Sequence, residues 1–182
     1  MKSYIKRTGF VVLLAVLSMA CDTNPSLQKY FVDSKENVEF ISIDLPASIL
    51  QLKNTEVSEE LKNTLNTIKK VNFLALKITE GNKDLYASEK EKVKAILKNP
   101  KYKQLMRMNL GNANVSINYL GEEEAIDEVV IFGAESEKGF AIVRVIGENM
   151  NPAEIMKLTQ EIKLDGDSNE FKQLEGLLSV MN

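Results

Sequence analysis

The chain has 182 residues, a formal net charge of −3, one cysteine, and neither histidine nor tryptophan. Without histidine, Ser-His-Asp and Cys-His catalysis and every His-containing zinc site are excluded. One cysteine excludes an intramolecular disulfide, and GxxxxGK[ST] and GxGxxG phosphate-binding loops are absent.

The first 21 residues have the order of a bacterial lipoprotein signal. A short basic start precedes an apolar run from Phe10 to Leu17, and small residues come immediately before Cys21. This run is shorter than the roughly 20 apolar residues that cross a bilayer. Because the order resembles a lipobox, we expect residues 1–20 to be a signal peptide and Cys21 to be lipidated, for example with palmitate. Ordinary secretory cleavage and an uncleaved anchor are the alternatives.

Removal of residues 1–20 would take away three Lys and Arg and no acidic residue. That leaves 20 Lys+Arg against 26 Asp+Glu, a net charge of −6. This acidic balance opposes nucleic-acid binding, which needs clustered cations. The remaining length suits one domain. We expect a lipidated N-terminus and polar tether over 21–37, with a short docking turn near residues 30–32, and a single domain over 38–182.

The first half of this domain is expected to mix strands and helices. Pro46 should stop the first strand, and apolar residues spaced by four, four and three from Val57 to Ile68 indicate a helix. Ser88 and Glu91 form a capping-box pattern that should begin another helix. The expected elements are strand 38–45, helix 47–52, helix 57–70, strand 71–79 and a helix from Ser88 that ends before Pro100.

The second half changes to period-two alternation, which is typical of strands. Gly111-Asn112 supplies the positive φ of a tight hairpin, and Asn151 followed by Pro152 is typical of a helix start. The expected elements are strands 102–110, 114–120, 126–132 and 140–146 and a helix from Asn151. Together the two halves predict an α+β domain: an antiparallel meander of about four strands after residue 100, one or two earlier strands, and helices packed on one face.

The order of these features resembles a known bacterial family. A lipobox-like start, "FISIDLP", "YKQLMRMN", "VSINYLGEEEAIDEVVIF" and "GFAIVRVIGENMNPAEIMKL" are similar to the envelope lipoproteins called domain of unknown function 4252. The resemblance covers Val38 to Leu164. It implies an anchored envelope protein of α+β type, and it transfers no catalytic residue and no cofactor.

Two acidic clusters are candidate chemical sites. Asp165-Gly166-Asp167 resembles the start of a calcium loop, but the glycine and the bidentate glutamate of an EF-hand are missing from their places. We therefore predict a turn there and no metal site. Glu122-Glu123-Glu124 could supply paired carboxylates for glycoside cleavage, but a hairpin turn normally leaves such groups in water.

A possible binding face follows from alternation along the strands. Met106 and Met108 should lie on the buried side and Arg107 on the outward side. The same rule turns a polar set outward from the other strands, namely Asn114, Ser116, Asn118 and Arg144. We expect Arg107 and Arg144 to form a weakly cationic patch that receives an anionic ligand. The structural alternative is that Arg144 pairs with Asp127 or Glu128.

Two functions from different classes remain open. The favoured one is a non-enzymatic binding or interaction module without a cofactor, held in the cell envelope by its lipid anchor, at the outer membrane on its periplasmic or surface face. Its partners would be the membrane and an unidentified envelope protein or anionic ligand, and no nucleic acid. The alternative is a carboxylate-dependent hydrolase that acts on cell-envelope polymers.

Overall fold

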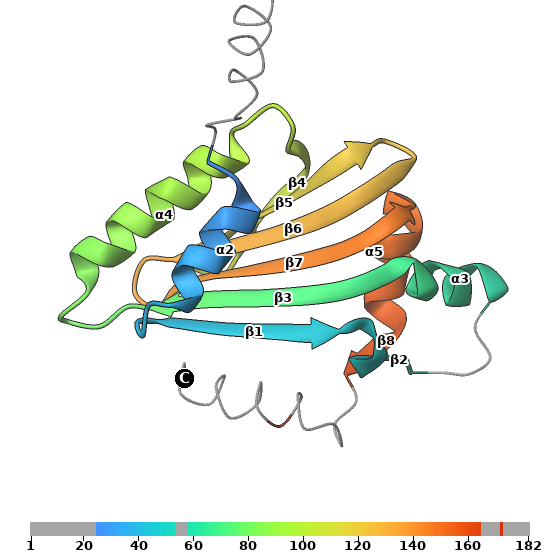
Figure 1. The fold of residues 1–182 in the computed structure, drawn as a ribbon, viewed down its shortest axis with the longest axis horizontal. Coiled ribbons are helices and arrows are strands. Elements are labelled where there is room, and N and C mark those ends of the chain that lie inside the picture. Colours follow the sequence, from blue (N-terminus) through green and yellow to red (C-terminus); the bar gives the residue numbers. More distant parts are fainter. Residues whose placement is uncertain (1–24, 54–57, 165–171, 173–182) are drawn as a thin grey trace, which may run out of the picture.

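The protein is described by a computed structural model that covers residues 25–53, 58–164 and 172. Six antiparallel strands form one sheet in the order β1-β3-β7-β6-β5-β4, and a second sheet pairs β2 with β8 (Figure 1). The α+β class and the meander of β4 to β7 confirm the predicted fold. The elements are α2 (Leu27–Lys35), β1 (Phe40–Pro46), the 3-10 helix η1 (Ala47–Ile49), β2 (Leu50–Leu52), α3 (Glu59–Thr67), β3 (Ile68–Lys77), α4 (Lys83–Leu97), β4 (Lys103–Leu110), β5 (Ala113–Glu122), β6 (Ala125–Glu135), β7 (Gly139–Met150), α5 (Pro152–Glu161) and β8 (Ile162–Leu164).

The early strands join the same sheet as the meander, because β3 pairs with both β1 and β7. The helix expected over 47–52 is instead η1 followed by β2, since residues 50–52 find a partner strand in β8. The start of α5 agrees with the prediction: the Asn151 side chain accepts hydrogen bonds from the backbone amides of Ala153 and Glu154. Among the described residues, no helix is long and apolar enough to span a membrane.

The prediction of a tether up to residue 37 is wrong for residues 27–35, because these residues form α2. Ser26 caps this helix by accepting a hydrogen bond from the backbone amide of Lys29 at 3.1 Å. Leu27, Tyr30 and Phe31 form a buried stripe at helical spacing. The domain therefore begins at or before Leu27, and α2 is part of its core.

The predicted start of the next long helix at Ser88 is also wrong. Helix α4 begins at Lys83, and the Ser88 hydroxyl donates to the backbone carbonyl of Leu85 inside the helix. Asn82, which precedes α4, accepts a hydrogen bond from the amide of Thr79 and donates to the carbonyl of Lys77. These bonds fix the turn between β3 and α4, and the helix can begin at the residue that follows.

The sheet has an apolar core on each face. Helices α2 and α4 cover one face (Figure 1). Leu74 and Ile142 lie on this face, where they belong to one cluster with Leu27 and Val93. The alternate residues of the same strands lie on the opposite face, where they pack with buried side chains of α3 and α5. The expectation that the helices pack on one face is therefore wrong for α3 and α5, because both faces of the sheet carry apolar side chains that need cover. We call the side that α2 and α4 cover the α2/α4 face and the opposite side the α3/α5 face.

Two glycines are needed where the strands turn or approach closely. Gly111 has a φ of +60° in the β4–β5 hairpin, which confirms the predicted turn. Gly139 opens β7 with a φ of +132°, and a Cβ atom there would lie 2.1 Å from the carbonyl oxygen of Leu76. A side chain at this position would therefore separate β7 from β3.

Strand β4 is less buried than alternation predicted. Met106 is 37% exposed and Met108 is half-buried, so the prediction of two core methionines is wrong for Met106. The register of β4 with β5 shifts between Gln104 and Met106, and β4 forms one edge of the sheet. The apolar cluster on the α3/α5 face includes no residue of β4.

Candidate functional site

A groove of about 650 Å³ runs between α4 and strands β4 to β6 on the α2/α4 face. We call it the α4–β4 groove. Four of the five residues predicted to form a binding face lie along it, because β4, β5 and the open side of α4 meet there. These residues are Arg107, Asn114, Ser116 and Asn118.

The polar floor of the groove comes from one side of β5. Arg107 pairs in register with Ser116, and Asn118 donates to the Ser116 hydroxyl at 3.3 Å. Asn118 is only 5% exposed, so its amide is held in one place. Fixed amide and hydroxyl groups of this kind can orient a polar ligand by hydrogen bonds.

The rim is cationic, and most of it was missed by the sequence analysis. Lys90, Lys94 and Lys98 recur every four residues along α4 and line the groove opposite Arg107. Glu91 is the one acidic residue in the lining. The Lys94 ammonium donates to the Glu91 carboxylate at 2.8 Å and holds its pKa below the usual value, and the charges of Lys90 and Lys98 act in the same direction. The i, i+4, i+8 lysine spacing was the signal that could have revealed this rim.

Aromatic side chains form the inner wall. Tyr86, Tyr102 and Phe132 line the groove, and the Tyr86 hydroxyl donates to the carbonyl of Glu135 at 3.0 Å. The Lys90 ammonium lies 4.8 Å from the centre of the Tyr86 ring, within range of a cation–π contact. Burial raises the pKa of Tyr102, and the nearby Glu128 carboxylate adds to this shift. The wall can therefore take an apolar or planar part of a ligand.

Arg144 does not belong to the open patch for which it was proposed. It is 8% exposed, and its guanidinium donates to the Glu128 carboxylate at 2.6 Å. It also donates to the Gln28 side chain and lies 6.0 Å from the centre of the Phe31 ring. The prediction failed because α2, which was expected to be tether, covers this part of the sheet. The structural alternative, a pair with Glu128, is the one observed.

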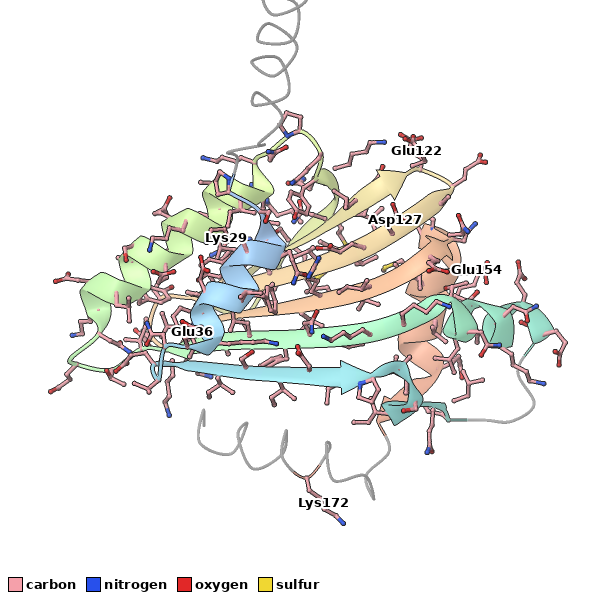
Figure 2. All side chains as sticks on the ribbon, viewed as in Figure 1. Lys29, Glu36, Glu122, Asp127, Glu154 and Lys172 are labelled. Atoms are coloured by element: carbon pink, nitrogen blue, oxygen red, sulfur yellow. The ribbon has the colours of Figure 1, made fainter. Side chains whose placement is uncertain are left out.

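The acidic turn between β5 and β6 lies in solvent. Glu122, Glu123 and Glu124 are exposed, and Figure 2 shows Glu122 at the far end of the β5–β6 hairpin from α2. The Glu122 carboxylate lies 3.9 Å from the ammonium of Lys103. General-acid carboxylates normally lie in enclosed pockets, a setting that differs from this turn. A carboxylate-dependent hydrolase therefore stays an untested hypothesis.

Two predicted positions, the lipidation site Cys21 and the acidic segment 165–169, lie outside the residues that the structure describes. Within the described ranges, no group of three or more Cys, Asp or Glu side chains is arranged to hold a metal ion.

Comparison with known proteins adds the family. No curated protein and no solved structure matches the chain. A family model matches residues 30–158, from α2 to α5, which is more than half of the chain and includes the α4–β4 groove. The chain belongs to the family described as Domain of unknown function (DUF4252).

Proposed function

We propose that the domain is a non-enzymatic binding module of the cell envelope that receives an anionic ligand in the α4–β4 groove. One observation carries the proposal: four cationic side chains and a single acidic one line the groove of a protein whose net charge is −3. A concentration of positive charge against the overall balance attracts anions to this place.

Each part of the groove has a separate task in binding. Lys98 and Arg107 have no ion-pair partner among the described residues and supply attraction from opposite walls. The Asn118 amide and Ser116 hydroxyl fix the orientation of the ligand, and the aromatic wall excludes water from its inner side. Exposed charges contribute at most about 1 kcal/mol each, so the affinity should be moderate and should fall with salt.

The N-terminal sequence supports a location at the membrane. Lipidation at Cys21 would leave five residues, 22–26, between the anchor and the start of α2. An extended chain spans at most about 3.6 Å per residue, so α2 would lie within about 20 Å of the lipid surface. A domain held this closely would bind ligands at the membrane, in the envelope and at its outer membrane.

The proposal is tested with tripolyphosphate, a small anion that carries no peptide backbone. Isothermal titration calorimetry at low salt should show binding to the wild type and at least about tenfold weaker binding to the Lys98→Glu/Arg107→Glu variant, because two attractions become repulsions. Lys62→Glu/Lys69→Glu is the charge-matched control, since both lysines lie outside the groove lining, Lys69 exposed and Lys62 half-buried. Equal binding by the groove variant and the wild type would refute the proposal, provided circular dichroism shows both folded.

A further inference from the structure

Strand β4 is an open edge of the sheet with unusual side chains. It has eight residues and pairs only with β5 among the described strands, so its outer backbone groups face no partner strand there. Five large apolar side chains of the described residues are exposed, and three of them lie on β4: Leu105 at 39%, Met106 at 37% and Leu110 at 60%. Soluble proteins normally shorten, charge or cover such an edge.

The charge on β4 has one sign. Lys103 and Arg107 lie on it, and the strand has no acidic residue. Lys103 is 3.9 Å from Glu122 and near the Tyr119 ring, whereas Arg107 lines the α4–β4 groove. A strand that paired with β4 would therefore meet positive charge together with exposed apolar side chains.

The two faces of β4 offer different surroundings. Arg107 is on the groove side, opposite Ser116. Met106 pairs in register with Ile117, whose side chain packs on the α3/α5 face. Leu105, Met106, Pro152 and Met156 line a pocket of about 420 Å³ there, and the exposed Glu123 and Glu124 lie at its border, so this side suits apolar side chains and not acidic ones. An added strand would place alternate side chains in these two surroundings.

We propose that β4 is the docking edge for an extended segment of another envelope protein in which acidic and apolar residues alternate. The segment adds to the sheet as a seventh strand. Its acidic side chains enter the α4–β4 groove beside Arg107, and its apolar side chains cover Met106 and Leu105. This inference rests on the proposed function, because it identifies the anionic ligand of the groove as a peptide.

The probe is a fluorescein-labelled peptide of eight alternating Glu and Val residues, measured by fluorescence anisotropy with the wild-type domain. Binding should weaken at least about tenfold, equivalent to about 1.4 kcal/mol, when alternate peptide amides are N-methylated, because a methylated amide cannot donate to β4. Hydrogen exchange at β4 should slow when the unmethylated peptide binds. Met106→Asp should weaken binding, whereas Val32→Asp, at a 50% exposed apolar residue of α2, should not.

Four outcomes would overturn the inference. Equal binding of the methylated and unmethylated peptides would show attraction by charge without strand addition. Binding of tripolyphosphate without binding of the peptide would leave the proposed function intact and reject the strand. Binding of neither would reject both. Sedimentation that shows a dimer broken by Met106→Asp would assign the edge to a second copy of the chain, even though Lys103 and Arg107 of two β4 strands would repel one another.

Discussion

The buried pair of Arg144 and Glu128 offers the sharpest test of the packing. The two side chains are 10% and 5% exposed and lie 2.6 Å apart, beneath α2. Removing one partner leaves the other charge buried without compensation, which typically costs about 3–5 kcal/mol. Arg144→Met and Glu128→Gln should each lower the free energy of unfolding by this amount.

The double replacement separates the pair from its surroundings. Arg144→Met/Glu128→Met removes both charges and keeps apolar volume, so it should be more stable than either Arg144→Met or Glu128→Met alone, and a double-mutant cycle on these variants should give a coupling of about 3 kcal/mol. Urea unfolding with an unchanged m-value measures these energies. The exposed pair of Lys29 and Asp33, at 2.8 Å and with side chains 72% and 60% exposed, is the control and should couple by less than about 1 kcal/mol. The reasoning would be refuted if the single variants lost less than about 1 kcal/mol of unfolding free energy, or if the loss in the double variant equalled the sum of the two single losses.

Four further predictions concern the anchor, the core and the response of stability to low and high pH. Cys21→Ala should abolish palmitate labelling and membrane retention, and unchanged labelling would contradict lipidation at this residue. Phe140→Ala should cost about 3–5 kcal/mol in urea unfolding, because this 2% exposed ring packs against three other aromatic rings, and a loss below about 1 kcal/mol would show that the site collapses freely. Burial tends to raise the pKa of Asp44, but hydrogen bonds from Lys35 and Lys70 outweigh it and hold the pKa below its usual value. Stability should therefore fall as the pH drops below about 4, and a urea series across this range should be flatter for Asp44→Asn. Burial and the neighbouring Glu89 raise the pKa of Tyr30 far above its usual value, so stability should fall as the pH rises above about 10, less so in Tyr30→Phe, and an equal fall in both proteins would contradict this.

Local chemistry was sufficient to predict the meander and its turns. Gly111 can adopt a positive φ, Pro152 suits a first helical turn, and apolar residues alternate along β5 to β7, so each element follows from a few neighbouring residues. Helix α2 was not predicted, although the sequence carries its signal. Ser26 can cap a helix, and Leu27, Tyr30 and Phe31 follow at helical spacing. The segment is hydrophilic on average because polar residues separate these three, and the average does not reveal the apolar stripe that they form.

The candidate site was only partly predictable, because it joins segments distant in the chain. Alternation was enough to place Asn114, Ser116 and Asn118 on one side of β5 and Arg107 beside them. Nothing local to α4 says which strands Lys90, Lys94 and Lys98 will face. Their role in the groove depends on how α4 crosses the sheet.

The sequence by itself determined the four strands of the meander, their order and the chemical classes that the chain cannot use. Tertiary structure alone decided which helices cover which face of the sheet. Period-two alternation separates two faces and does not say which of them a helix will bury. Arg144 was placed on the correct face, and the packing of α2 over that face turned an expected surface charge into half of a buried ion pair.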